Sequence, residues 1–148
     1  MNRFDYDMII YGSRQMPVAF IELKNKKSMD ESFAMEFKKN VLQNNGYINA
    51  PYFLLISQEK GFLWKNVNSD IDEPPTLSFN MKEVMEKYMP DKEIHWLKKT
   101  ELELVTLKWL VELAYLREAP ENTAEESLLG SGFLQAIKGG SVQMGVTQ

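Results

Sequence analysis

The 148-residue chain contains no cysteine and a single histidine, His95. Without cysteine there is no disulfide framework, no cysteine-ligated zinc or iron–sulfur site and no catalytic thiol. One histidine excludes metal motifs built on two imidazoles, and a serine triad would have one candidate base and no G-x-S-x-G elbow. His95 alternates with Ile94 and Trp96, which favours a structural or surface residue over a general base.

Long hydrophobic runs are also missing. No apolar segment approaches the roughly 18–20 residues needed to cross a bilayer. The first ten residues, MNRFDYDMII, carry acids where a secretory signal carries bases, and they offer no small-residue cleavage site. We therefore expect a soluble, cytoplasmic protein that makes no membrane contact.

The chain has no overall excess of positive charge, because its net charge is −4. This balance argues against a protein that coats nucleic acid nonspecifically. However, residues 22–65 hold seven bases and five acids, whereas residues 66–148 hold eight bases and fourteen acids. If a polyanion binds, we expect it to contact residues 1–65, where several lysines could bind phosphates. Ordinary variation in charge along the chain explains the difference between the two halves equally well. These lysines are Lys24, Lys26, Lys27, Lys38 and Lys39.

The length and composition fit a single domain, residues 1–148, whose first 65 residues predict a mixed sheet crossed by a helix. Two apolar runs around Gly12–Pro17 are typical of a β-hairpin. Ser28 and Glu31 have the spacing of a capping box at the start of a helix. The continuous run Tyr52–Ser57 indicates a buried central strand, joined to the hairpin by a βαβ crossover. The expected strands are Met8–Tyr11, Val18–Leu23, Tyr52–Ser57 and Gly61–Lys65, with the helix Ser28–Asn45 packed across them.

The rest of the chain predicts a helical extension. Residues 66–79 are polar, contain Pro74-Pro75 and are expected to form a loop. Residues 80–140 are expected to form helices, of which Thr100–Glu118 is apolar nearly all round and should be buried. Gly130 and Gly132 should weaken or kink the last helix, and residues 141–148 should form a frayed tail. Helix starts are expected at the capping-box pairs Asn80 and Glu83, Thr100 and Glu103, and Thr123 and Glu126.

One group of side chains could carry chemistry: Asp7, Glu22 and Lys24. Glu22 and Lys24 are two apart at the end of an apolar strand, so they project to the same side. Asp7 opens the partner strand, and the hairpin returns its carboxylate beside Glu22. Two carboxylates and the Leu23 carbonyl suit a hard cation such as Mg²⁺. Such an ion can polarise a phosphoryl oxygen and acidify water, and an adjacent ammonium can stabilise the developing charge. The other interpretation is an exposed salt bridge worth about 0–1 kcal/mol.

The order Asp7-Met-Ile-Ile-Tyr, a turn and Val18-Ala-Phe-Ile-Glu22-Leu-Lys24 resembles the PD-(D/E)xK nuclease superfamily, which has the restriction-endonuclease-like fold. It is similar to the nuclease domain of type I restriction enzyme R subunits and to small uncharacterised bacterial relatives. The resemblance covers about residues 5–65. It implies Asp7 and Glu22 as ligands of Mg²⁺ or Mn²⁺, and Lys24 as the catalytic lysine. A polar residue on the following helix often borders such sites. Gln43 matches best and Glu36 second, and Asp5 could face the site beside Asp7.

The resemblance also implies a helix and a first strand ahead of the aspartate, but only six residues precede Asp7. Either that part has been trimmed from this chain, or another element fills its place. We expect an α/β fold without the N-terminal helix and with a helical C-terminal extension. The expected function is a Mg²⁺-dependent endonuclease-like domain that hydrolyses DNA phosphodiester bonds. The alternative is a catalytically inactive module of the same fold that binds DNA or protein, or assembles with a second copy or a partner subunit.

Overall fold

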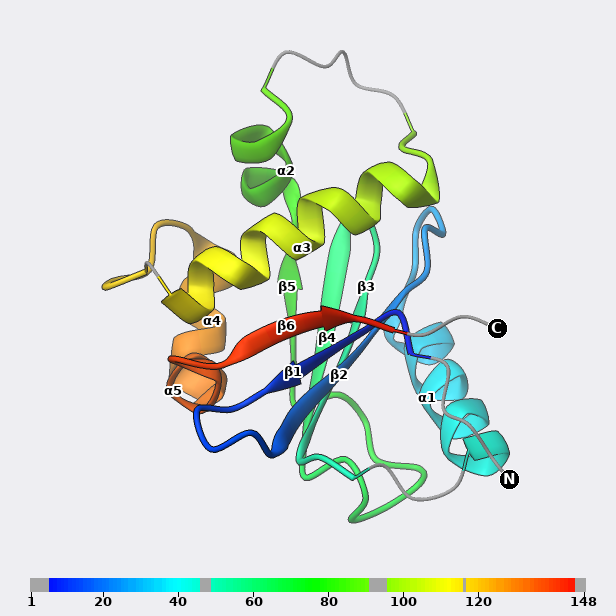
Figure 1. Ribbon diagram of the computed structural model, residues 1–148. Coiled ribbons are helices and arrows are strands. Elements are labelled where there is room, and N and C mark those ends of the chain that lie inside the picture. The colour runs from blue at the N-terminus through cyan, green and yellow to red at the C-terminus, as the bar shows by residue number, and fades with distance from the viewer. Residues whose placement is uncertain (1–5, 46–48, 91–95, 116, 146–148) are drawn as a thin grey trace.

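A computed structural model describes residues 6–45, 49–90, 96–115 and 117–145 and shows a mixed sheet with helices on both faces (Figure 1). The sheet has six strands in the order β5-β4-β3-β2-β1-β6. The predicted α/β class is confirmed. No helix within the described ranges is long and apolar enough to span a membrane. The strands are β1 (Met8–Tyr11), β2 (Pro17–Leu23), β3 (Tyr52–Ile56), β4 (Lys60–Lys65), β5 (Leu77–Asn80) and β6 (Ser141–Met144). The helices are α1 (Glu31–Asn45), α2 (Lys82–Tyr88), α3 (Lys99–Tyr115), α4 (Thr123–Ser131) and α5 (Phe133–Ile137).

The centre of the sheet follows the predicted order. β1 and β2 form an antiparallel hairpin in which Met8 pairs with Ile21, and the register shifts between Ile10 and Tyr11. β2 then leads through α1 to β3, which lies parallel to it, and β4 returns antiparallel to β3. β3 is buried along its whole length, as expected of a central strand covered on both faces. The predicted hairpin, crossover and central strand are confirmed.

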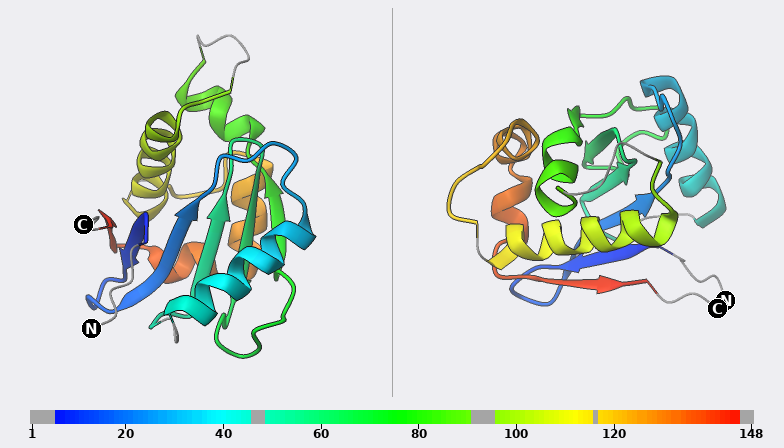
Figure 2. Two further views of the ribbon diagram at one scale, coloured as in Figure 1. Left: turned by 90° about the vertical axis from the view of Figure 1, so that its right-hand side faces the viewer. Right: turned by 90° about the horizontal axis from the view of Figure 1, so that it is seen from above.

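Side-chain alternation divides the core into two layers, one on each face of the sheet (Figure 2). On one face α1 packs Phe33 and Phe37 against a cluster that includes Phe20, Phe53 and Trp64. On the other face α3, α4 and α5 cover a larger cluster. Its members include Met8, Ile10, Ile21, Leu54, Trp109, Leu110 and Phe133. The predicted burial of the α3 helix is confirmed for one face, where Leu102, Val105 and Leu113 lie in this larger cluster. It is wrong for the opposite face, where Leu104 is 52% exposed.

Two short strands were not expected. The predicted loop 66–79 ends early, because β5 pairs with β4 from Leu77 to Asn80. The prediction of a frayed tail is wrong for Ser141–Met144, which form β6 and pair antiparallel with the whole of β1. An element from the C-terminal part of the chain therefore lies beside β1. The expected helical extension thus also contributes the strand at each edge of the sheet.

The helix starts differ from the predicted capping boxes by one or a few residues. At α1 the cap is Asp30, whose Oδ1 accepts the Phe33 N–H at 2.8 Å; Ser28 instead has a left-handed φ of 55°. At α4 the cap is Asn122 rather than Thr123. Asp and Asn cap helices as well as Ser and Thr do, so a sequence with several such residues in a row does not fix the start. The predicted break at Gly132 is confirmed, because its φ of 90° separates α4 from α5.

Candidate functional site

Asp7, Glu22 and Lys24 lie together where β1 begins and β2 ends. β1 begins at Met8, which pairs with Ile21 of β2. Asp7 directly precedes β1, and its carboxylate contacts the backbone of Leu23, the residue that follows Glu22. Glu22 alternates with Leu23 and lies on the sheet face of Phe20, which α1 covers. The hairpin therefore brings the Asp7 carboxylate to the end of β2 that carries Glu22. Asp5, the other acid predicted near the site, lies outside the described residues, as does His95.

Both carboxylate oxygens of Asp7 have partners. Oδ2 accepts the Leu23 backbone N–H at 2.7 Å, and Oδ1 lies 3.3 Å from the Lys99 ammonium at the start of α3. The Asp7 side chain is 16% exposed, and its backbone carbonyl accepts the Gly145 N–H at 2.8 Å. Asp7 is thus held by β2, by α3 and by the chain that follows β6. The N–H and C=O of an extended residue point to the same side of a strand, so the Leu23 carbonyl also faces the β1 side.

Glu22 is half-buried, and its negative charge affects the pKa of the Tyr6 hydroxyl. Tyr6 is 2% exposed and stacks on Phe20 with ring centroids 4.3 Å apart. Burial, and secondarily the negative charge of Glu22, raise the pKa of the Tyr6 hydroxyl well above its ordinary value of 10.0. Tyr6 therefore stays protonated and contributes no second negative charge beside Glu22.

Lys24 completes the predicted trio. Its backbone N–H donates to the Ile56 carbonyl at 3.0 Å, so the pairing of β2 with β3 continues past Leu23 and the alternation of side chains with it. Lys24 therefore projects to the side of Glu22. The side chain is exposed, and it makes no hydrogen bond or ion pair with any residue that the structure describes. Its ammonium is available to an external anion.

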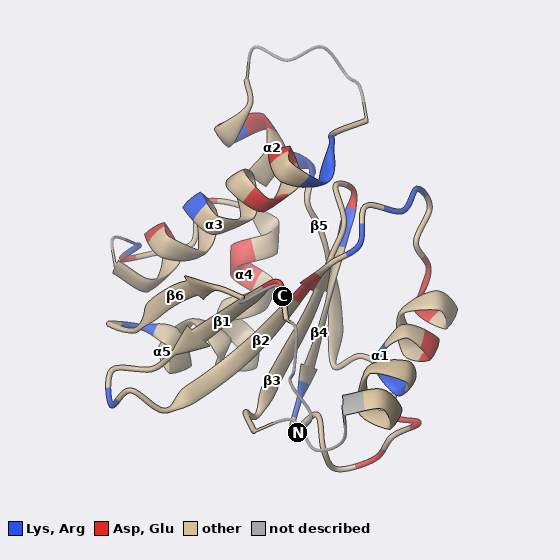
Figure 3. Ribbon diagram, turned by 45° about the vertical axis from the view of Figure 1, so that its right-hand side comes forward, with Lys and Arg blue, Asp and Glu red and all other residues tan. Residues whose placement is uncertain are grey.

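Further lysines surround this end of the sheet (Figure 3). Lys26 and Lys27 follow β2, while Lys98 and Lys99 begin α3, and all four are exposed. A polar junction brings the two segments together. In it the Trp96 indole N–H donates to the Asn25 carbonyl at 3.1 Å, the Asn25 side-chain amide donates to the Leu97 carbonyl, and the Leu97 N–H donates to Gln58 Oε1 at 2.7 Å. The sequence analysis missed Lys98 and Lys99, which lie in the acidic part of the chain and carry no local motif.

Two further predictions about site residues are not supported by their placement. Gln43 and Glu36 are exposed on α1, and α1 leads away from the Glu22 end of the sheet toward its opposite end (Figure 2). Gln43, close to the last residue of α1, therefore lies away from Asp7. Lys38 is fully buried and donates to the carbonyl oxygens of Asp70 at 2.9 Å and Glu73 at 3.2 Å. The prediction that Lys38 contacts phosphates is wrong, because its ammonium holds the loop after β4.

The side chains at this site that suit a hard cation are two carboxylates, those of Asp7 and Glu22. Among the residues that the structure describes, no three His, Cys, Asp or Glu side chains gather closely enough to hold a metal ion. Asp7 and Glu22 supply carboxylate oxygens, and Leu23 can add its carbonyl; these are ligands that Mg²⁺ and Mn²⁺ accept, with water filling the remaining positions. In the described structure both Asp7 oxygens are already in contact with Leu23 and Lys99, so an ion would have to displace one of these contacts.

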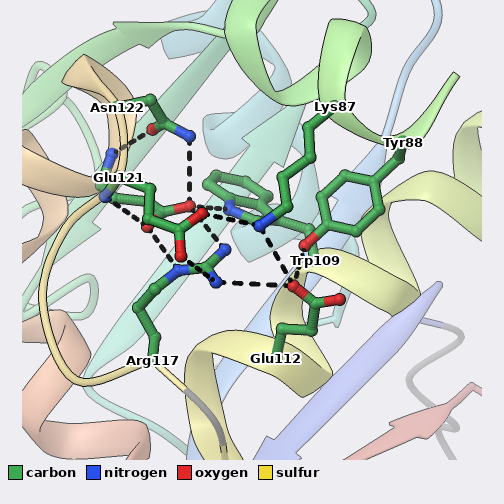
Figure 4. A network of polar contacts seen from close by, with 8 residues as sticks. Lys87, Tyr88, Trp109, Glu112, Arg117, Glu121 and Asn122 are labelled. Atoms are coloured by element: carbon green, nitrogen blue, oxygen red, sulfur yellow. Dashed lines mark hydrogen bonds and ion pairs between the residues drawn. The ribbon is translucent and has the colours of Figure 1, made fainter. Parts of the chain in front are cut away.

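A second cluster of charged side chains joins α2, α3 and α4 (Figure 4). Its centre is Glu125, which is fully buried. The Glu125 carboxylate accepts five hydrogen bonds, from two guanidinium nitrogens of Arg117, the Trp109 indole, the Asn122 amide and the Glu121 backbone N–H. Lys87 bonds Glu121 at 2.7 Å, and the Tyr88 hydroxyl donates to Glu112. Because the buried carboxylate is fully paired, this cluster is explained by its contribution to the packing of the helices.

Compared with protein-family models, curated proteins and solved structures, the chain matches none. The residues at the end of the β1–β2 pair are therefore the basis for assigning a function.

Proposed function

We propose that this chain is a Mg²⁺-dependent endonuclease-like domain that hydrolyses DNA phosphodiester bonds. The observation that carries the proposal is the contact of the Asp7 carboxylate with the Leu23 backbone, next to Glu22. Lys24 is exposed at the same end of β2 and makes no side-chain ion pair with the described residues. This is the set of groups that the resemblance to the PD-(D/E)xK superfamily implies. The strand β6 beside β1 and the crossover from β2 through α1 to β3 support the finer proposal of a restriction-endonuclease-like sheet.

In the proposed site, Asp7, Glu22 and the Leu23 carbonyl would hold Mg²⁺ or Mn²⁺. A bound ion of this kind supplies a Lewis acid and lowers the pKa of a coordinated water. Lys24 binds a non-bridging phosphate oxygen through its free ammonium and stabilises negative charge as it develops there. Because Glu22 is fixed on a paired strand and Asp7 is bonded to Leu23, both carboxylates are positioned before a substrate arrives.

The lysines around the site support a polyanionic substrate. Lys24, Lys26 and Lys27 lie after β2, and Lys98 and Lys99 lie at the start of α3. Phosphate contacts of this kind give affinity and position without reading sequence.

Cleavage of supercoiled plasmid in Mg²⁺ or Mn²⁺ tests the proposal. We expect Glu22→Gln and Lys24→Ala to lower the cleavage rate by about 100-fold or more, the usual effect of removing one group that stabilises the reacting charge. Glu86→Gln and Lys108→Ala, at exposed positions on α2 and α3, are matched controls and should cleave like the wild type. Equal activity in all five proteins would reject the assignment of the site.

The second candidate function is a catalytically inactive module that binds DNA or protein. The observation in its favour is that both carboxylate oxygens of Asp7 already have partners within the chain. Calorimetric titration with Mn²⁺ separates the two candidates. Binding that is lost in Glu22→Gln supports the enzyme, whereas no detectable uptake of Mn²⁺ by the wild type supports the module.

A further inference from the structure

Lys99 is the cation in contact with the candidate metal ligand Asp7. Its ammonium lies 3.3 Å from Asp7 Oδ1, while the other oxygen, Oδ2, is taken by the Leu23 N–H. Oδ1 is therefore the oxygen that an ion at this site would use. The Lys99 side chain is 57% exposed, so its ammonium can leave Asp7 and move into solvent without breaking any core packing.

The position of Lys99 in its helix is unfavourable for the helix itself. Lys99 is the first residue of α3, and Lys98 precedes it. The N-terminus of a helix carries partial positive charge, so a cation there is unfavourable, whereas an anion is stabilised. The anions at this end of α3 are Glu101, which accepts the Lys98 backbone N–H, and Asp7, which pairs with Lys99. Lys99 therefore stays at this helix end through its pairing with Asp7, and a phosphate that entered here would compete with Asp7 for the same ammonium.

We propose that Lys99 exchanges between two anions of the site. Without a divalent ion its ammonium neutralises Asp7; when an ion binds Asp7 and Glu22, Lys99 moves to a phosphate oxygen of the bound nucleic acid. This inference rests on the proposed function and adds a second substrate-binding lysine, from α3, to Lys24 of the β2 end. It links metal binding to substrate binding, because the ion releases the lysine that the phosphate requires.

The proposal predicts effects of opposite sign for Lys99→Gln. Calorimetry with Mn²⁺ in the absence of nucleic acid should show binding about two- to fivefold tighter than wild type, because a competing ion pair of about 0.4–1 kcal/mol is lost. Lys98→Gln removes the same charge one residue away and should change the Mn²⁺ affinity by less than the Lys99 variant does. Unchanged or weaker Mn²⁺ binding by Lys99→Gln, beside a wild type that binds in a Glu22-dependent manner, overturns the inference and leaves the proposed function standing.

Duplex DNA binding in Ca²⁺, measured against salt concentration, provides the second readout. Lys99→Gln should bind DNA more weakly, and the slope of log K against log[salt] should fall by about 0.9, the value for one lost phosphate contact. Lys108→Gln, on the same helix but away from the site, should leave the slope unchanged. A residue that only supports the fold would lower both affinities and leave the slope alone, which contradicts the proposal. If neither the wild type nor Lys99→Gln takes up Mn²⁺, the proposed function fails and this inference with it.

Discussion

Two buried polar side chains differ in whether burial has left them with hydrogen-bond partners. Lys38 is fully buried, but its ammonium bonds two carbonyl oxygens and lies 5.7 Å from the centre of the Trp64 ring. Burial lowers its pKa, and the nearby acids Glu73, Asp70 and Asp72 partly oppose that effect. Thr106 on α3 is also fully buried, yet its hydroxyl has no hydrogen-bond partner among the described residues. Hydrogen bonds offset the cost of burying the Lys38 ammonium, whereas none of the described residues offsets the cost of burying the Thr106 hydroxyl.

Thr106→Val should therefore stabilise the protein. Valine keeps the shape of threonine and removes a hydroxyl whose unpaired burial costs about 1–3 kcal/mol. We expect the free energy of unfolding to rise by about 1 kcal/mol, measured by urea denaturation at neutral pH. A loss of stability in Thr106→Val would show that the hydroxyl has a partner, such as a buried water molecule.

Among the elements of the fold, the edge strand β6 is held close to the neighbouring chain by glycines at its two ends. A Cβ on Gly140 would lie 2.1 Å from the Tyr11 carbonyl oxygen, and one on Gly145 would lie 1.4 Å from the Tyr6 carbonyl oxygen. The chain at both ends of β6 thus approaches β1 more closely than any other residue type permits. This close approach places the C-terminal part of the chain beside Asp7.

Gly140→Ala and Gly130→Ala form a matched pair that tests this packing. Gly140→Ala should lower the free energy of unfolding by about 1–3 kcal/mol, because β6 must shift to relieve an overpacked contact. Gly130 lies within α4 with nothing within 4 Å of an added Cβ, so Gly130→Ala should raise the free energy of unfolding by about 0.5–1 kcal/mol. Thermal and urea denaturation of the two variants would measure both. A stabilised Gly140→Ala would mean that β6 does not pack on β1 as described.

The elements that the sequence predicted are those with long local patterns. The run Tyr52–Ser57 and the stripe of Phe33, Phe37 and Val41 on α1 carry their own periodicity, so the central strands and α1 followed from it. β5 and β6 are four residues each, and the sequences LSFN and SVQM contain no comparable run. What makes them strands is pairing with β4 and β1, and for β6 that partner lies at the other end of the chain. Tertiary pairing of this kind leaves no local signal.

The same distinction applies to the candidate site at the scale of the whole molecule. The return of Asp7 to the end of β2 could be predicted, because a hairpin return is a local rule, and its carboxylate does contact the Leu23 backbone. The positions of Lys98 and Lys99 could not be predicted. These lysines lie near the site because residues 96–97 are hydrogen-bonded to Asn25 and Gln58, which are far away in the sequence. The prediction for Gln43 was wrong because the sequence pattern shows which side of a helix is apolar but not the direction in which the helix crosses the sheet.

The buried charge cluster on the helical side makes the stability of the whole molecule depend on pH. Burial would raise the pKa of Glu125, but hydrogen bonds from Arg117 and Trp109 outweigh burial and hold the pKa below 4.5. The hydrogen bond from Tyr88 lowers the pKa of Glu112 in the same way. Because the folded-state pKa values lie below the unfolded ones, these carboxylates stabilise the fold fully above about pH 4.5. This contribution is lost as the pH falls through the folded-state values.

Glu125→Ala should lower the free energy of unfolding by about 3–5 kcal/mol at neutral pH, because it leaves Arg117 partly buried without its main partner. The variant should also lose less stability than the wild type as the pH is lowered from 6 to 3. Urea denaturation across that range measures both effects. Glu126→Ala, at the exposed neighbouring position, is the control and should change stability by less than about 0.5 kcal/mol. Parallel pH profiles for Glu125→Ala and the wild type would contradict the assigned role of Glu125.

In the proposed site, Asp7, Glu22 and the Leu23 carbonyl would hold a divalent ion beside Lys24. Crystals of the full chain soaked in Mn²⁺ would reveal such an ion by anomalous scattering. We expect a peak within about 2.0–2.3 Å of a carboxylate oxygen of Asp7 and of Glu22, with the Lys99 ammonium moved away from Asp7. A map without a peak at the β1–β2 end, in crystals where Lys99 still contacts Asp7, would contradict it.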